Sequence, residues 1–251
     1  MRTIQGYGWK RDTDRRAPTF LPRLARAQVP DTFDWWQRIT APPCWDQQQT
    51  GSCVGHGRER QHWLCRIICN LPEPFEPSRM GTYWQARNIE GSTGLDAGAE
   101  IHDAIYAGVT VGVGRAIDWP FDESKVLDTP PQAFFDNAIK SEIKDYRRVD
   151  PTSIFDLMEA ITIAPVVFGI PVFESFESKF VEDTGIVPMP AASEQLMGGH
   201  CMLFTGYDRS NSRFTVDNSW GPNWGKNGRC YLPFDYVTQQ ADDCWLVTLE
   251  T

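Results

Sequence analysis

The sequence has no long apolar run, and no stretch approaches the roughly 18 apolar residues that a membrane-spanning helix needs. Its first residues, MRTIQGYGWKRDTDRR, contain no apolar segment of the kind that directs secretion. Asn-x-Ser/Thr glycosylation sites are also absent. These absences exclude the usual marks of a secreted or membrane protein, and we expect a cytoplasmic protein without a membrane partner.

Cysteine occurs without a recognisable pairing pattern. The count is odd, and the seven positions are 44, 53, 65, 69, 201, 230 and 244. A leftover thiol in a chain without a secretion signal indicates a reducing compartment and a free cysteine, reactive or buried. Cys230 and Cys244 lie in strand-like runs and are candidates for one disulfide, which the sequence leaves open.

Positive charge is scarce in the chain as a whole and concentrated at one end. The net charge of -9 argues against nucleic acid as the main partner. Residues 1–30 nevertheless carry a net charge of +5, which leaves -14 for the remainder. A basic arm on an acidic body either docks back on that body or extends into solvent as a tail.

Composition and patterning predict an α+β protein with two lobes. With 251 residues, of which 41% are hydrophobic, the chain can fold around a sizeable core. Helical patterns occupy 52–70, 78–91 and 98–108, and a short helix is expected within 129–143. Beyond them, a helix at 153–162 precedes strand-like runs at 165–173, 201–208, 213–220, 228–234 and 244–250. We therefore divide the chain into a basic arm at 1–30, a mainly helical lobe at 31–142 and a mainly β lobe at 143–251.

The stretch QQTGSCVGHG places Cys53 in the first turn of the helix expected from Ser52 onwards. Ser52 suits the N-cap position, and Gly51 allows a sharp turn before it. Unpaired backbone N–H groups and the helix dipole favour an anion at this end, and they lower the pKa of a thiol placed there. Cys53 is therefore a candidate nucleophile, although a cysteine at a helix start is more often structural.

Two later stretches supply the groups that a cysteine nucleophile needs. GGHCMLFTGYD places His200 at the start of a buried strand, and VDNSWGPNWGKNG places Asn218 at the end of the next. An imidazole can hold a thiolate as an ion pair and later protonate a leaving amine, while an amide can fix the orientation of the ring. Neighbouring strands bring His200 and Asn218 side by side, and the indole of Trp220 can shield the bond between them from water.

Together these stretches resemble the papain-like (C1) cysteine peptidases over residues 30–251. DQQQTGSCVGHG is similar to the family's Gln and Gly-Ser-Cys motif, GGHCMLFTGYD to its His motif and DNSWGPNWGKNG to its Asn motif, the most specific of the three. The resemblance implies a papain-like fold, in which a helical lobe and a β-barrel-like lobe flank the active-site cleft. It assigns Cys53 as nucleophile, His200 as acid and base, and Asn218 as the residue that orients His200.

The same resemblance implies further site residues. Gln47, six residues before Cys53, matches the side-chain donor that stabilises the oxyanion together with the backbone N–H of Cys53. GLDAGAEI resembles the glycine-bearing segment that lines the substrate cleft, so Gly98 is a candidate substrate-binding residue. Trp220 of the Asn motif is a second candidate for substrate binding. No cofactor and no metal are implied.

Three departures from the family's pattern point to a bacterial, phage or other intracellular branch. Val54 stands where the family usually has Trp, and Thr50 stands where secreted members carry a disulfide cysteine. About 30–40 residues precede the catalytic part, in place of a long inhibitory prodomain. None of these departures removes a catalytic group.

Other motifs have less demanding interpretations. His62, Cys65 and Cys69 have helical spacing and could bind zinc, but without a fourth ligand nearby they are better explained as a core face. We expect His56 to be a partly exposed helix residue and His102 to lie on the surface. GVTVGVG lacks the lysine and the following helix of a phosphate-binding loop.

The sequence thus predicts a monomeric thiol peptidase that cleaves polypeptides through a thioester acyl-enzyme. The alternative is a catalytically silent papain-like module that serves as an interaction, virion or effector component. Because the arm is basic and the body acidic, we also expect residues 1–30 to lie across the cleft and restrain activity.

Overall fold

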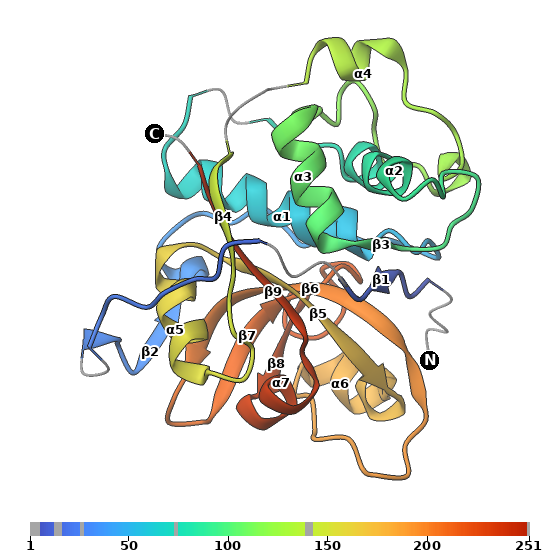
Figure 1. The fold of residues 1–251 in the computed structure, drawn as a ribbon. Helices are drawn as coiled ribbons and strands as arrows, with labels where there is room; N and C mark the ends of the chain where they lie inside the picture. Colours follow the sequence, from blue (N-terminus) through green and yellow to red (C-terminus); the bar gives the residue numbers. More distant parts are fainter. Residues whose placement is uncertain (1–5, 13–16, 26–27, 73–74, 139–142, 250–251) are drawn as a thin grey trace.

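The structure is a computed structural model that describes residues 6–12, 17–25, 28–72, 75–138 and 143–249. Within the basic arm, Arg2, Arg15, Arg16 and Arg26 lie outside the described residues. Figure 1 shows helices gathered in one half of the molecule and a sheet in the other. The chain therefore has the two-part α+β arrangement predicted from its sequence.

The helical half contains α1 (Cys53–Ile68), α2 (Arg79–Ile89), α3 (Ile101–Thr110) and the short α4 (Gln132–Asp136). α2 begins where the sequence predicts, because the Ser78 side chain accepts a hydrogen bond from the N–H of Gly81. α1 packs closely on both halves. A Cβ at Gly55 would lie 2.4 Å from the carbonyl oxygen of Arg79, and one at Gly57 would lie 2.8 Å from Sγ of Cys201. The two glycines that weaken the helical pattern are therefore the positions where α1 approaches its neighbours.

The other half is built on a seven-stranded antiparallel sheet. Its strands follow the order β4-β9-β5-β6-β7-β8, and β2 pairs with β6 beside this path. The bounds are β2 (Thr32–Asp34), β4 (Ile143–Arg148), β5 (Val166–Phe173), β6 (Leu196–Asp208), β7 (Arg213–Asp217), β8 (Arg229–Pro233) and β9 (Asp243–Leu249). Three helices accompany the sheet: α5 (Ile154–Ile163), α6 (Lys179–Thr184) and α7 (Phe234–Gln240).

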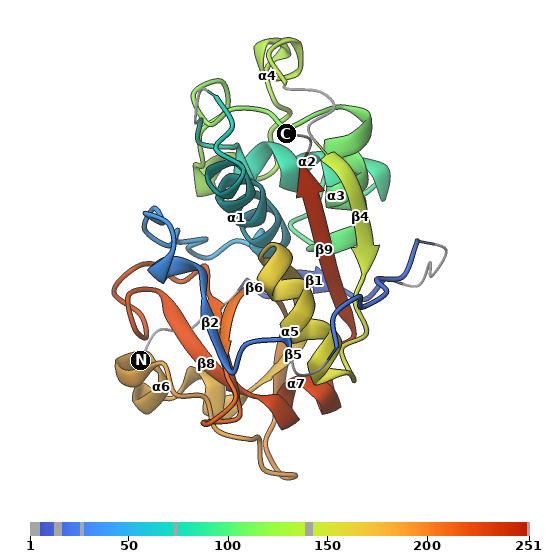
Figure 2. The same cartoon turned by 90° about the vertical axis from the view of Figure 1, so that its left-hand side faces the viewer.

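The boundary at residue 31 does not coincide with the division in space. β2 follows this boundary directly, yet it pairs with β6 in the sheet (Figure 2). Figures 1 and 2 also show β4 and β9 running from the sheet up beside α3. Strand pairing between distant segments, rather than local composition, decides where these residues lie.

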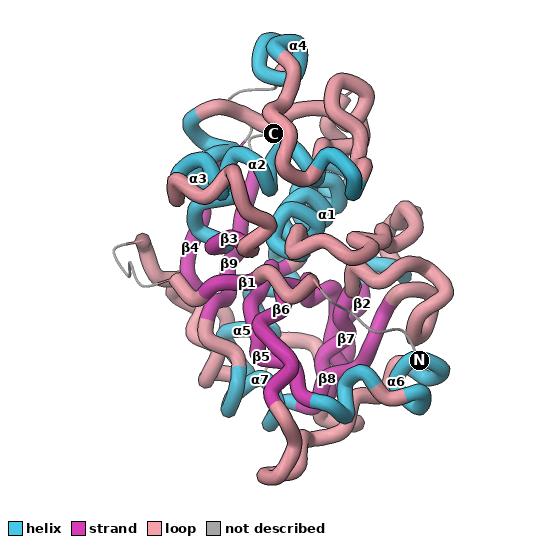
Figure 3. Tube along the Cα trace, turned by 90° about the vertical axis from the view of Figure 1, so that its right-hand side faces the viewer, coloured by secondary structure: helices cyan, strands magenta, loops and turns pink. Residues whose placement is uncertain are grey.

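A short strand of the arm lies between the two halves. β1 (Trp9–Lys10) pairs in parallel with β3 (Ala99–Glu100), which leads directly into α3, and it also contacts β5 and β6 (Figure 3). The arm therefore crosses the junction where α1 meets β6.

Candidate active site

Cys53 is the first residue of α1 and is fully buried. Ser52 occupies the N-cap position, but its side chain makes no capping bond. Its hydroxyl instead contacts Oγ1 of Thr50 at 2.6 Å and Nδ1 of His56 at 3.2 Å. The expected position of Ser52 is thus observed, while the expected capping bond is replaced by contacts within the loop and the first turn.

His200 and Asn218 lie side by side on neighbouring strands. Nε2 of His200 is 2.8 Å from Oδ1 of Asn218. The same Oδ1 accepts a hydrogen bond from the backbone N–H of Ser219 at 2.8 Å, which fixes the amide with its oxygen toward the imidazole. Nε2 must therefore carry the proton, and this leaves Nδ1 of His200 as the basic nitrogen.

Trp220 covers this pair. Its ring stacks on His200 with centroids 5.1 Å apart, and it is almost completely buried. In this position the indole excludes water from the His200–Asn218 bond, and a hydrogen bond shielded from water is electrostatically stronger.

Gln47 is held in a fully buried position by hydrogen bonds at both ends of its amide. Its Oε1 accepts from the Ser219 hydroxyl at 2.6 Å. Its Nε2 donates to the carbonyl oxygens of Thr50 and Gly6, each at 2.8 Å. The amide N–H group of Gln47 is thus occupied by a backbone carbonyl of the arm.

Residues 6–9 of the arm lie directly against the residues that the sequence singled out. The ring of Tyr7 makes an edge contact with His200 at 5.9 Å, and its hydroxyl donates to Glu177. The carbonyl of Gly8 accepts a hydrogen bond from the N–H of Ala99 at 2.7 Å. Gly98 has φ of +78°, and a Cβ there would lie 2.1 Å from that same Gly8 carbonyl. Because Gly98 has no side chain, the backbone of Gly8 can lie directly beside it, and the next residue, Ala99, donates the hydrogen bond to the Gly8 carbonyl.

Burial sets the acid–base state of the reacting groups. Removal from water raises the pKa of Cys53 to about 11, although backbone N–H groups of Cys201 and Gly8 oppose the shift. Burial lowers the pKa of His200 to about 4, against a smaller effect of Asn218. Between these values both groups are neutral. The expectation of a helix-stabilised thiolate is thus wrong for the arm-covered state, because desolvation outweighs the helix dipole.

After Trp9, the next three residues of the arm form ion pairs with the rest of the protein. Lys10 pairs with Glu90 before β3, Arg11 pairs with Asp242 before β9, and Asp12 pairs with Arg148 of β4. The described part of the basic arm therefore docks on acidic groups of the body, one of the two alternatives left open by the charge distribution.

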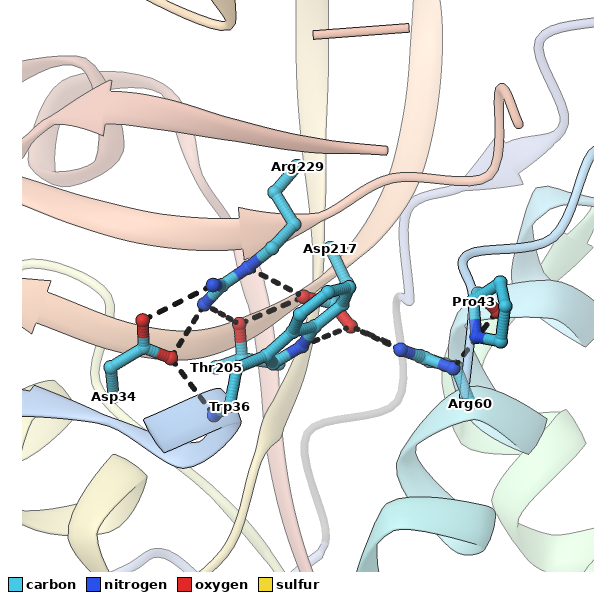
Figure 4. Close-up of polar contacts among 7 residues, drawn as sticks. All are labelled: Asp34, Trp36, Pro43, Arg60, Thr205, Asp217 and Arg229. Atoms are coloured by element: carbon cyan, nitrogen blue, oxygen red, sulfur yellow. Dashed lines mark hydrogen bonds and ion pairs between the residues drawn. The ribbon is translucent and has the colours of Figure 1, made fainter. Parts of the chain in front are cut away.

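A buried network of charges joins α1 to the strand that precedes Asn218 (Figure 4). Oδ2 of Asp217 accepts from Nε of Arg60 on α1 at 3.0 Å and from the indole of Trp36 at 3.2 Å. On its other side, Asp217 lies 3.3 Å from Nε of Arg229, and Arg229 in turn pairs with Asp34 at 2.6 Å. Asp217 lies in the DNSW stretch that contains Asn218, but no sequence motif signals its charged partners, because Asp34, Arg60 and Arg229 come from separate segments.

Two histidines are more buried than the sequence suggested. His56 is fully buried, with Nδ1 3.0 Å from the carbonyl oxygen of Ser52, and burial lowers its pKa to about 3. The expectation of a partly exposed residue was wrong because Trp45 and Phe121 pack against its ring. His102 is likewise half-buried, between Tyr106 and Trp245.

All seven cysteines are free, so Cys230 and Cys244 form no disulfide. His62 and Cys65 are buried and Cys69 is half-buried, as expected for a core face. Among the described residues, no group of three or more His, Cys, Asp or Glu side chains could hold a metal ion. None of the helices in the described ranges combines the length and apolarity required to cross a membrane.

Comparison with known proteins identifies the family. The profile described as "Papain family cysteine protease" matches residues 91–245. A peptidase C1-like protein of Acanthamoeba polyphaga mimivirus is 35% identical over 86% of this chain and 73% of its own length. Cysteine proteinase 3 of Dictyostelium discoideum is 25% identical over 90% of this chain, which spans 65% of that relative.

The fold matches a solved structure over its whole length. Xylellain, a cysteine protease from Xylella fastidiosa, superposes with a TM-score of 0.88 at 29% identity, over 100% of this chain and 99% of that one. Together with the matched profile, this likeness covers both the helical half and the sheet. The chain belongs to the papain family of cysteine proteases, and it is a cysteine peptidase with the two-lobe α+β fold of that family.

Proposed function

We propose that the protein hydrolyses peptide bonds with Cys53 as nucleophile, His200 as acid and base, and Asn218 as the residue that orients the imidazole. The observation that carries this assignment is the 2.8 Å bond between His200 and Asn218. The backbone N–H of Cys201, the residue after His200, makes a hydrogen bond to Cys53 at the start of α1. The His200–Asn218 bond leaves Nδ1 of His200 as the nitrogen that exchanges a proton with the sulfur.

In the proposed reaction, the Cys53 thiol transfers its proton to Nδ1 of His200, and the sulfur attacks the substrate carbonyl carbon. The C–N bond breaks as the imidazolium returns the proton to the leaving amine, which leaves a thioester on Cys53. Water, deprotonated by His200, then attacks the thioester and releases the acid product, and the proton returns to the sulfur. Asn218 keeps the imidazole oriented through both half-reactions.

Gln47 and the backbone N–H of Cys53 are proposed to stabilise the oxyanion of each tetrahedral intermediate. Support comes from the Nε2 group of Gln47, which already donates to one backbone carbonyl of the arm, that of Gly6. Loss of such a donor raises the barrier by about 3–4 kcal/mol. Gly98 is proposed to admit the substrate backbone, and Trp220 to shield the His200–Asn218 bond.

We further propose that residues 6–12 hold the enzyme in an inhibited state. The backbone N–H of Gly8 lies against the sulfur of Cys53, the carbonyl of Gly6 engages the amide of Gln47, and the ring of Tyr7 contacts His200. Catalysis then requires the arm to leave, because a substrate carbonyl must occupy the place beside Cys53.

Hydrolysis of a fluorogenic peptide library tests both proposals. A Cβ at Gly8 would lie 1.7 Å from the carbonyl oxygen of Gly51, so Gly8→Ala should displace the arm and raise the rate. Gly94→Ala is the matched control, since a Cβ there meets nothing within 4 Å. Adding Cys53→Ala to Gly8→Ala should abolish hydrolysis. If activity persists without the Cys53 sulfur, the nucleophile is wrong; if Gly8→Ala and wild type have equal rates, the inhibition is wrong.

A further inference from the structure

A small cavity lies behind the His200–Asn218 pair, between α1 and the sheet. His56 and Arg60 of α1 form part of its wall, and Asp217 and Asn218 at the end of β7 form another part. Figure 4 shows two of these wall residues, Arg60 and Asp217, in their ion pair. No described residue of the arm belongs to the wall. The cavity is therefore a feature of the body, and it does not depend on where the arm lies.

The size of this cavity suits a single water molecule. The centre of a water-sized sphere can move within about 10 Å³, which is about the space that one buried water requires. Apart from half-buried Trp45, every residue of the wall is buried. Cavities that stay empty are lined by apolar groups, whereas this one has charged and amide side chains in its wall. Its polarity and volume together favour one ordered water.

The amide of Asn218 brings an unused donor to the cavity. Its Oδ1 already accepts from Nε2 of His200 and from the backbone N–H of Ser219. Its Nδ2 carries two N–H groups, is buried, and has no hydrogen-bond partner among the described residues. A buried donor without a partner costs free energy, so a partner from outside the chain would stabilise the amide in its present orientation.

The imidazole of His56 brings an unused acceptor. Its Nδ1 lies 3.0 Å from the carbonyl oxygen of Ser52, and because a carbonyl only accepts, Nδ1 carries the ring proton. Burial lowers the pKa of His56 to about 3, although the carbonyls of Ser52 and Asp46 oppose the shift, so the ring is neutral. Nε2 is then an acceptor; it is buried, and within the described ranges no group makes a hydrogen bond to it.

The unused donor and the unused acceptor complement each other through one water. The water oxygen can accept from Nδ2 of Asn218, and one water hydrogen can be donated to Nε2 of His56. Arg60 offers a third contact, because its Nη2 lies 2.9 Å from Asp217 and makes no hydrogen bond in the described part of the chain. Three partners are typical of a buried water.

We propose that the cavity holds one structural water that links His56 to Asn218, and that His56 is a positioning residue for the reaction. Through the water, His56 holds the plane of the Asn218 amide, and the amide in turn holds the ring of His200. His56 touches neither the substrate nor the sulfur in this arrangement. The inference rests on the proposed function, because it extends the set of residues that orient His200.

Two variants separate the roles of the two ring nitrogens of His56. A glutamine side chain reaches the position of Nε2, whereas an asparagine side chain reaches only that of Nδ1. In the Gly8→Ala enzyme, His56→Asn should lower kcat for peptide hydrolysis about 10-fold and leave KM within about twofold, because one buried hydrogen bond to the water is lost. His56→Gln should retain most of kcat. Equal kcat values for His56→Asn and its parent, or equal losses in both variants, would overturn the positioning role.

His62→Asn is the matched control. His62 is also a fully buried histidine of α1, but it does not belong to the wall of the cavity. This substitution should leave kcat unchanged, whatever its effect on the melting temperature. A loss of kcat equal to that of His56→Asn would show that any disturbance of α1 slows the reaction, and it would contradict the proposal.

Two measurements on the full-length chain decide independently of catalysis. A crystal structure that resolves ordered waters should show one within hydrogen-bond distance of Nδ2 of Asn218 and Nε2 of His56, and an empty cavity would overturn the site. Nitrogen-15 NMR should show His200 protonated at Nε2 in wild type and as a mixture of tautomers in His56→Asn. Identical His200 signals would overturn the positioning role. If Gly8→Ala hydrolyses no peptide, the proposed function is wrong, while these two measurements still decide the water and its effect on His200.

Discussion

At the scale of single residues, the reacting groups lie in an environment that keeps them neutral. Motifs in the sequence locate Cys53, His200, Asn218 and Gln47, since each motif is a short local pattern. Their protonation could not be predicted in the same way. It depends on burial and on hydrogen bonds from distant segments, among them the backbone N–H of Gly8, which lies more than 40 residues from Cys53 in sequence.

The pKa shifts predict how fast Cys53 is alkylated at different pH. The thiolate is the reactive form, and burial raises the thiol pKa to about 11, so wild type should react with iodoacetamide slowly until the pH approaches that value. Gly8→Ala should react near neutral pH. Displacement of the arm would expose the Cys53 sulfur to water and allow the imidazole of His200 to take its proton, so the thiol pKa should fall. Mass spectrometry of the Cys53 peptide measures both rates. Equal rates at pH 7 would contradict the desolvated site.

At the scale of helices and strands, the sequence predicted most elements and missed the short ones. α1, α2, α5 and the apolar strands β5 to β9 have strong local periodicity. β1 and β2 are two and three residues long, and β4, with the sequence IKDYRR, is dominated by charged side chains. Long-range hydrogen bonds create these strands, so no local pattern reports them.

The charge network around Asp217 joins α1 to β7, and it predicts how much stability is lost when Asp217 is replaced. Asp217→Ala would leave Arg60 and Arg229 buried without their shared carboxylate, and the free energy of unfolding should fall by about 3–5 kcal/mol. Asp31→Ala is the control, since it removes an exposed pair with Arg209 and should cost less than about 1 kcal/mol. Urea unfolding measures both. Similar losses in the two variants would mean that the network does not join the two elements as described.

At the scale of the whole molecule, basic residues of the arm form ion pairs with acidic residues of the body. Lys10 and Arg11 pair with Glu90 and Asp242, and these pairs are partly open to solvent. The sequence predicted that a basic arm could return to an acidic body. It could not predict the path of the arm, because that path is set by backbone contacts at Gly8 and by the space that Gly169 and Gly199 leave for the ring of Trp9.

Salt should therefore activate the wild-type enzyme. Raising ionic strength from about 0.01 M to about 1 M shortens the Debye length from about 30 Å to about 3 Å and weakens exposed ion pairs. Peptide hydrolysis by wild type should increase over this range, while Gly8→Ala, with its arm already displaced, should respond little. The ratio of the two rates is the measured quantity. A ratio that does not change with salt would show that charge does not hold the arm.

The most direct test of the account is the mass of the protein after incubation with an epoxysuccinyl thiol-protease inhibitor. In the Gly8→Ala chain we predict one inhibitor per molecule, mapped to Cys53 and absent when Cys53→Ala is added, with markedly slower labelling of wild type. Labelling at another of the seven cysteines, or none with the arm displaced, would contradict the claim that Cys53 is a nucleophile paired with His200 and closed off by the arm.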